Sequence, residues 1–135
     1  MLDTNILISA ALFPNGQAAK AFIKAVLPPY EPVICDYVID ELSKKFKEKF
    51  PEKIAELDAF LFKVLSVIKI VKVPDEKDSS ELRIRDPKDR PILRSALKKK
   101  VELFLTGDKD FLDSEISHPR ILNPTEFLNL EIKQR

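Results

Sequence analysis

The amino-acid sequence predicts an α/β fold, a three-layer α/β/α sandwich with a central parallel sheet of four to five strands. Short β-branched or apolar runs alternate with longer patterns of helical period, which is the order that βαβ units require. Prolines and turn residues keep the connections between these segments short. The length of 135 residues fits one compact domain, residues 1–135. Right-handed crossovers would then bring the carboxyl ends of the strands to one edge of the sheet.

Apolar spacing and proline positions define the elements of the first half of the chain. Apolar residues recur at helical spacing on both sides of the turn signal Pro14–Asn15–Gly16. Residues 32–35, Pro-Val-Ile-Cys, are short, β-branched and preceded by prolines, as in a buried parallel strand. The expected elements are a strand ending at Leu2, helices over residues 5–13 and 17–27, a strand over 32–35 and a helix over 37–49.

The second half continues the alternation. Pro51 opens a helix, because proline is tolerated in the first turn, and apolar residues recur at helical spacing from Ile54 to Leu65. Residues 67–73 are rich in valine and isoleucine and predict a strand. The polar residues 74–87 are expected to form a loop with one helical turn at 80–84. The remaining expected elements are a helix over residues 90–100, a strand over 101–106, a helical turn over 110–113, a strand over 120–122 and a helix from 124 to 128.

Acidic residues stand where this sheet would expose its carboxyl edge. Asp3 and Asp108 each directly follow a predicted strand, and open α/β sheets bind ligands at such strand ends. Glu41 lies about 60° from Val38 on a helical wheel, beside the core-facing stripe, whereas Asp40 points to water. A carboxylate at the border of a core is costly unless it is paired or binds a metal. Glu41 is therefore the stronger candidate of these two neighbours.

Asp89 is the fourth candidate acid. The sequence Asp86-Pro87-Lys88-Asp89 is typical of a turn, and Pro91 is best tolerated in the first turn of a helix. Asp89 then lies at helical spacing from the apolar residues of that helix and extends its buried face. Asp86 and Asp110 are candidate auxiliary acids, and Asp110, two residues after Asp108, could assist the site or only cap a helix.

Each acid alone also fits a structural role. Asp3 and Asp89 are suited to capping helices, and Glu41 to pairing with a neighbouring lysine. Together, four uncompensated carboxylates in one cleft would repel one another and raise their pKa values. A bound cation removes that repulsion, and oxygen-only ligation suits Mg²⁺ or Mn²⁺. Such a site engages phosphate esters and can activate a water molecule, with one or two ions.

The four acids, in this order, resemble the PIN-domain family of metal-dependent ribonucleases, most closely its prokaryotic toxin components of toxin–antitoxin pairs. The likeness covers nearly the whole chain, and each motif is weak alone but fairly specific in this order and spacing. The matching segments are Leu2-Asp3-Thr4-Asn5, Asp40-Glu41-Leu42, Asp86 through Ala96, Leu105 through Leu112, and Ile121 through Phe127.

The resemblance implies single-stranded RNA as substrate and Mg²⁺ or Mn²⁺ as cofactor. By that analogy Asp3 and Asp108 contact the metal most directly, and Glu41 and Asp89 complete the pocket, partly through water. Thr106 and Asn5 would orient water or a phosphate oxygen. Family members are often dimers, and toxin members are silenced by a small antitoxin.

The chain departs from the family pattern at its start. Family members usually have several apolar residues before the first aspartate, and here only Met1 and Leu2 precede Asp3. Either the first strand is unusually short or the natural chain starts earlier.

Two rival functions remain at this point. A phosphatase of the aspartyl-phosphate kind would use Asp3 as nucleophile, but it usually has a second aspartate two residues later, where this chain has Asn5. The other rival is a catalytically silent RNA- or protein-binding module of the same fold. A pure binder of polyanions gains nothing from four carboxylates in its cleft, so we predict the ribonuclease.

Composition sets the remaining limits. A formal net charge of +1 gives no broad cationic surface for nucleic acid, and the one cysteine, Cys35, excludes an internal disulfide and a cysteine-based zinc site. No stretch reaches the roughly 18 apolar residues of a membrane helix, and no signal peptide precedes Asp3. We therefore expect a cytoplasmic protein that does not enter a membrane.

Overall fold

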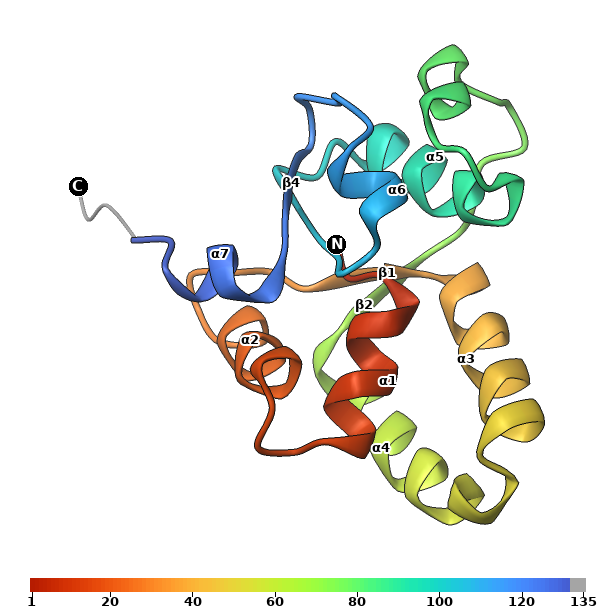
Figure 1. The fold of residues 1–135 in the computed structure, drawn as a ribbon, viewed down its shortest axis with the longest axis vertical. Coiled ribbons are helices and arrows are strands. Elements are labelled where there is room, and N and C mark those ends of the chain that lie inside the picture. Colours follow the sequence, from red (N-terminus) through yellow and green to blue (C-terminus); the bar gives the residue numbers. More distant parts are fainter. Residues whose placement is uncertain (132–135) are drawn as a thin grey trace.

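The computed structural model describes residues 1–131, so the last four residues of the predicted domain lie outside the described part. The helices are α1 (Thr4–Leu12), α2 (Gln17–Ala25), α3 (Asp36–Lys49), α4 (Ile54–Val67), α5 (Arg90–Lys99), α6 (Lys109–Leu112) and α7 (Pro124–Leu128). The strands are β1 (Val33–Cys35), β2 (Lys69–Val71), β3 (Leu103–Leu105) and β4 (Arg120–Leu122), with 3-10 helices η1 (Pro51–Lys53), η2 (Ser79–Arg83) and η3 (Pro87–Asp89). Figure 1 shows α1, α2 and α4 below the level of β1 and β2, and α5 and α6 above it.

The strands form two short parallel ladders. β1 pairs with β2, and β3 pairs with β4. Residues 1–3 lie between the ladders, because the Leu2 N–H donates to the Val33 carbonyl at 3.1 Å while Leu2 also forms a parallel bridge with Leu105. The predicted α/β class with parallel strands is confirmed. One continuous sheet of four to five strands is not, since the described residues form two two-stranded ladders joined through residues 1–3.

Element boundaries differ from expectation mainly at the strands. β2 begins at Lys69 instead of residue 67, because α4 continues through Val67 and the Ile68 N–H still donates to the Val64 carbonyl at 2.9 Å. β3 begins after residue 102, because Lys100 closes α5 in the left-handed conformation with φ 58°. β-branching therefore identified the strand segments but overestimated their length.

The buried core fixes the direction in which the chain leaves residue 3. Leu7 of α1, Phe46 of α3, and Phe104 and Phe111 of the β3–α6 segment are fully buried, and the rings of Phe104 and Phe111 lie 4.8 Å apart. Burial of each such side chain contributes about 1.5–3 kcal/mol. Because Leu7 lies only one helical turn after Asp3, its burial orients the start of α1 and hence the Asp3 carboxylate.

Helices α1 and α2 form a bent pair. Within residues 1–131 no single helix is long and apolar enough to cross a membrane, whereas α1 and α2 together meet the length and composition, with a bend of 113° between them. Both helices contribute fully buried side chains to the core, among them Leu7 and Ala21.

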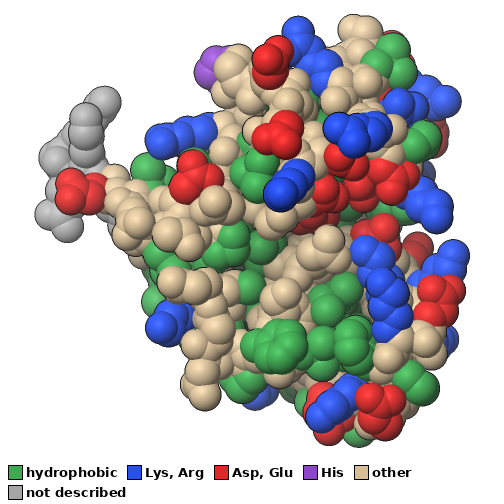
Figure 2. Space-filling view, viewed as in Figure 1, with side chains coloured by type: hydrophobic (Ala, Val, Ile, Leu, Met, Phe, Trp, Pro, Cys, Tyr) green, Lys and Arg blue, Asp and Glu red, His purple; other side chains and the backbone are tan. Residues whose placement is uncertain are grey.

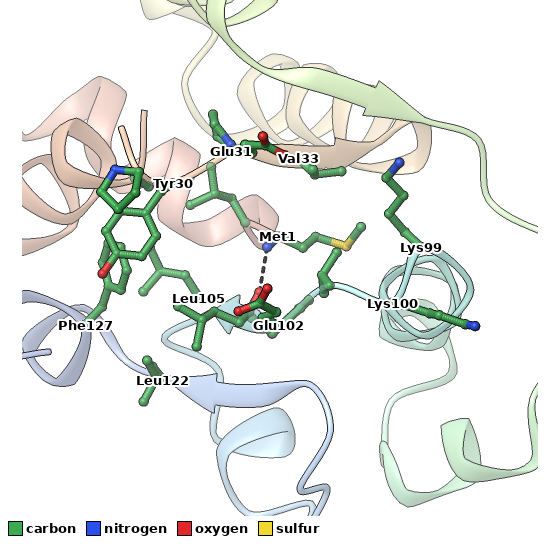
Figure 3. Close-up of a pocket in the computed structure, with 17 residues that line it drawn as sticks. Met1, Tyr30, Glu31, Val33, Lys99, Lys100, Glu102, Leu105, Leu122 and Phe127 are labelled. Atoms are coloured by element: carbon green, nitrogen blue, oxygen red, sulfur yellow. Dashed lines mark hydrogen bonds between the residues drawn. The ribbon is translucent and has the colours of Figure 1, made fainter. Parts of the chain in front are cut away.

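A cavity lies at the amino ends of the strands (Figure 3). It has a volume of about 480 Å³, and Met1, Tyr30, Glu102, Leu103 and Phe127 are among the residues that line it. The Met1 amino group points toward it and donates to the Leu103 carbonyl at 2.7 Å. None of the predicted site residues lines this cavity, so it is separate from the acidic site at the other strand ends.

Candidate active site

Asp3 is the most deeply buried of the four candidate acids. Its N–H donates to the Leu105 carbonyl at 3.0 Å, so its backbone continues the strand, and its Oδ1 accepts from the Thr4 N–H at 2.8 Å. The capping role considered from the sequence is therefore confirmed. The residue is 3% exposed. Burial raises the pKa of the Asp3 carboxyl to about 6, although hydrogen bonds from Thr106 and Thr4 act in the opposite direction.

Thr106 joins the ends of two strand segments. It follows β3, is fully buried, and its Oγ1 donates to Asp3 Oδ2 at 2.7 Å. The same oxygen accepts from the Asp108 N–H at 3.0 Å. Thr106, predicted to orient water or a phosphate oxygen, thus fixes the Asp3 carboxylate and the backbone that carries Asp108. Asp108 also caps α6, since its Oδ1 accepts from the Asp110 N–H at 2.9 Å.

Glu41 reaches the same place from α3. Its Oε1 accepts a hydrogen bond from the Thr4 hydroxyl, which connects α3 to the start of α1. The side chain is half-buried, whereas Asp40 is exposed, as the helical wheel predicted. The alternative of a lysine partner is wrong for the described structure: within residues 1–131, Glu41 forms no ion pair with lysine.

Asp89 stands at the N-cap position of α5 without capping it. Its side chain accepts no hydrogen bond from the helix. One carboxylate oxygen each of Asp89, Asp108 and Asp110 lies within 4.8 Å of the others. Burial raises the pKa of Asp89 to about 7, with further contributions from the negative charges of Asp3 and Asp108. The capping alternative therefore does not describe this residue, and its carboxylate is available to a ligand.

Asn5 and Asp86 lie at the border of the site. Asn5 is exposed, and its Oδ1 accepts from Lys45 Nζ at 3.3 Å. Asp86 Oδ1 accepts from the Lys88 N–H at 3.0 Å and so caps η3. Neither side chain hydrogen-bonds to the four central acids.

Three neighbours of the acids had no role predicted from the sequence. Thr4 is 1% exposed and binds Glu41 through its hydroxyl. Tyr37 lies one turn before Glu41 on α3, and its pKa is raised by burial and then by the charges of Glu41 and Asp89. Arg85 Nε lies 3.8 Å from Asp110 Oδ1. Tyr37 could have been found from its spacing of four residues before Glu41.

The donor set fits a hard divalent cation. It consists of carboxylate oxygens, which Mg²⁺ and Mn²⁺ prefer. The raised pKa values of Asp3 and Asp89 arise from burial and mutual repulsion, and a cation would relieve both. Figure 2 shows Asp and Glu side chains gathered to the upper right of centre, with Lys and Arg side chains along their border.

Comparison with known protein families shows to which family the chain belongs. The sequence model of the PIN domain matches residues 1–110, which contain all four central acids. This chain belongs to the PIN domain family. PIN domains are generally nucleases, and they typically use divalent metals. The family resemblance noted from the sequence motifs is confirmed.

A solved structure shares the fold of this PIN domain. It is a chain in the crystal structure of VapBC2 from Rickettsia felis bound to a DNA fragment from their promoter. The TM-score is 0.67 at 18% sequence identity, and the match covers 91% of this chain and 96% of the other. Among curated proteins, no sequence matches.

The raised pKa values of Asp3 and Asp89 predict that the stability of the metal-free protein falls as the pH rises. A carboxyl whose folded pKa is raised holds its proton more tightly in the folded state, so the metal-free PIN domain loses stability as pH rises from about 4 to about 7. Asp89→Asn should therefore raise the Tm of the metal-free protein at pH 8 by a few degrees, about 1 kcal/mol after allowance for solvent screening. At pH 4 the difference should vanish.

Thermal unfolding followed by circular dichroism measures this effect, with and without Mn²⁺. Mn²⁺ should raise the Tm of the wild type more at pH 8 than at pH 5, and should do so less in Asp89→Asn. Asp40→Asn, an exposed acid, is the matched control. An equal response of both variants to pH would contradict the burial argument.

Proposed function

We infer that this PIN domain is a metal-dependent ribonuclease that hydrolyses phosphodiester bonds in single-stranded RNA. The observation that carries the proposal is the convergence of Asp3, Glu41, Asp89 and Asp108 without a basic partner. Asp3 is 3% exposed, and within residues 1–131 none of the four forms an ion pair with lysine or arginine. A carboxylate buried as deeply as that of Asp3, with three partly buried acids beside it, is costly unless a cation accompanies it. A divalent cation held there would also attract the phosphates of RNA.

The proposed ligands divide by their geometry. Asp3 and Asp108 would hold Mg²⁺ or Mn²⁺ most directly, because both follow strand ends that Thr106 fixes relative to one another. Glu41 and Asp89 would complete the pocket, partly through water. Asp110 lies close to Asp89 and Asp108, and these three carboxylates would provide ligands for a second ion.

The protein side chains perform the positioning in this proposal. Thr106 holds the Asp3 carboxylate, and Thr4 holds the Glu41 carboxylate. Asn5, at the exposed border, would orient water or a phosphate oxygen. When bound, the cation supplies the acidity that activates a water molecule as nucleophile and offsets charge on the phosphate.

We further propose that this PIN domain is the toxin of a toxin–antitoxin pair and acts in the cytoplasm. The fold match to a VapBC2 toxin–antitoxin complex supports a small antitoxin as partner. Exposed apolar side chains, among them Phe13 and Phe62 at 64% and 81% exposure, provide surface for an antitoxin or for a second copy in a dimer.

The pairing is tested by co-purifying this PIN domain with the product of a small neighbouring reading frame. Loss of RNA cleavage in that complex would support the pairing. Unchanged cleavage in that complex would count against it.

The direct test is cleavage of labelled RNA. We expect purified protein to cut single-stranded RNA with Mg²⁺ or Mn²⁺, to lose this activity in EDTA, and to regain it when Mn²⁺ is restored. A duplex of the same sequence and a simple phosphate monoester serve as comparisons. Hydrolysis of the monoester without RNA cleavage would indicate the phosphatase, and RNA binding without cleavage at any metal concentration would indicate the silent binding module.

A further inference from the structure

We propose that Arg85 binds a backbone phosphate of the RNA next to the acidic site. This inference rests on the proposed function and adds a substrate contact to it. Arg85 lies in the loop between η2 and η3, and its side chain is 88% exposed. Its Nε is 3.8 Å from Oδ1 of Asp110, one of the three acids whose carboxylate oxygens cluster. Within residues 1–131 it forms the one ion pair that involves the acids of this site.

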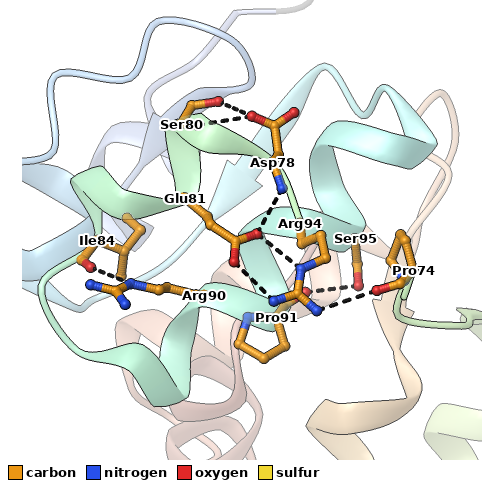
Figure 4. Close-up of polar contacts among 9 residues, drawn as sticks. All are labelled: Pro74, Asp78, Ser80, Glu81, Ile84, Arg90, Pro91, Arg94 and Ser95. Atoms are coloured by element: carbon orange, nitrogen blue, oxygen red, sulfur yellow. Dashed lines mark hydrogen bonds and ion pairs between the residues drawn. The ribbon is translucent and has the colours of Figure 1, made fainter. Parts of the chain in front are cut away.

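The backbone on both sides of Arg85 is fixed. Ile84 is fully buried, and its carbonyl accepts from Arg90 Nε at 3.0 Å (Figure 4). On the other side, the Asp86 side chain caps η3 by accepting from the Lys88 N–H. The peptide that carries Arg85 is therefore held while its side chain remains in solvent.

A buried ion pair extends this support to α5. Glu81 accepts two hydrogen bonds from Arg94, both of 2.9 Å, and Arg94 also donates to the Pro74 carbonyl at 3.3 Å (Figure 4). These contacts attach the segment before Arg85 to the helix whose first turn follows Asp89. The segment that carries Arg85 and the start of α5, where Asp89 lies, are thus held together by these hydrogen bonds. They fix the distance between a phosphate bound to Arg85 and the acids.

The contact with Asp110 is weak enough to be exchanged. Ion pairs of exposed side chains contribute little to stability, because water screens them and the long side chain loses freedom. A cation among Asp89, Asp108 and Asp110 would also reduce the attraction of Asp110 for Arg85. The guanidinium group is then free to donate its two-pronged hydrogen bonds to phosphate oxygens, which arginine does better than lysine.

The test compares Arg85→Ala, Arg85→Lys and Arg83→Ala in RNA binding. Arg83 is the matched control, since it is exposed, precedes Arg85 by two residues and contacts the Glu115 carbonyl away from the acids. Binding of a short labelled single strand is measured by fluorescence anisotropy with Ca²⁺, over a range of salt concentrations. Arg85→Ala should weaken binding about tenfold and reduce the slope of log K against log salt by about 0.7, the value for one phosphate contact on a single strand. Arg85→Lys should fall between, and Arg83→Ala should stay within about twofold of wild type.

A second measurement identifies the phosphate. Neutral methylphosphonate linkages are placed one at a time along the RNA, and the difference between wild type and Arg85→Ala should disappear at one linkage only. Mn²⁺ affinity without RNA should be unchanged or slightly tighter in Arg85→Ala, because a competing cation has been removed. An unchanged salt slope, or an equal loss in Arg83→Ala, would overturn the assignment.

The outcomes separate this inference from the proposed function. If wild type cleaves RNA and Arg85→Ala keeps its affinity and salt slope, the inference alone fails. If binding depends on Arg85 but no metal supports cleavage, the ribonuclease proposal fails and the phosphate contact stands. If wild type neither binds nor cleaves RNA, both are rejected.

Discussion

Asp3→Asn should lower kcat/KM for metal-dependent RNA cleavage by on the order of a hundredfold to a thousandfold. Asparagine keeps the size of the side chain and can still accept from the Thr4 N–H, so α1 keeps its cap. The change removes the negative charge at the most buried position of the site. Few water molecules can reach this position, so water cannot take over the role of the lost carboxylate as a ligand of the cation. Asp108→Asn should have an effect of similar size, because the two residues end neighbouring strand segments joined by Thr106.

Three measurements make this prediction specific. Initial rates give kcat and KM, calorimetric titration gives Mn²⁺ affinity, and thermal unfolding checks the fold. Asp40→Asn, which neutralises the exposed neighbour of Glu41, should retain full activity. Full activity of Asp3→Asn together with unchanged Mn²⁺ affinity would remove Asp3 from the proposed site.

Arg94→Ala should lower the free energy of unfolding by about 3 kcal/mol and the Tm by roughly 10 °C. Side chains of Arg94 and Glu81 are only 13% and 4% exposed. Removing the arginine leaves the Glu81 carboxylate buried with one remaining contact, from the Asp78 N–H at 3.2 Å. Replacing both partners with leucine should cost less than the single change, because no charge is then left without a partner.

The ion pair also predicts a pH dependence opposite to that of Asp89. Hydrogen bonds from Arg94 hold the pKa of Glu81 below its ordinary value. The stability from this pair is therefore fully present above the ordinary glutamate pKa and is lost as pH falls through the lowered value. Urea unfolding from pH 7 to pH 3 measures it in wild type and Arg94→Ala. Lys98 occupies an exposed position of α5, so the free energy of unfolding of Lys98→Ala should stay within about 0.5 kcal/mol of wild type. A loss of about 3 kcal/mol in this control would show that the effect comes from the helix and not from the ion pair.

The sequence was informative where local chemistry dominates. Helix bounds followed from apolar spacing and prolines, and Asp40 and Glu41 were separated correctly because a helix fixes the angle between neighbouring residues. Val67 was assigned to a strand by its β-branched side chain, yet α4 extends over it, because its neighbours Val64 and Ile68 are buried and the Ile68 N–H still donates to the Val64 carbonyl.

Contacts between distant segments could not be predicted in this way. Thr4 with Glu41, and Glu81 with Arg94, join residues 37 and 13 positions apart whose types are common on protein surfaces. Asp89 shows the same limit, since a capping acid and a free acid have the same sequence signature and only the missing cap bond distinguishes them. The sequence predicted the acids and Thr106 as site residues, but the hydrogen bonds of Thr106 and Thr4 to the acids, and the position of Arg85, required the three-dimensional structure.

The position of residues 1–3 between the two ladders has a consequence for protein synthesis. Met1 and Asp3 hydrogen-bond to β3 through their backbone, and the Asp3 side chain accepts from Thr106, which lies 103 positions later in the chain. A nascent chain therefore lacks the Thr106 hydroxyl group that holds Oδ2 of Asp3 until residue 106 has left the ribosome. If the proposed ribonuclease activity is correct, the growing chain cannot cut the messenger from which it is being translated until most of it has been made.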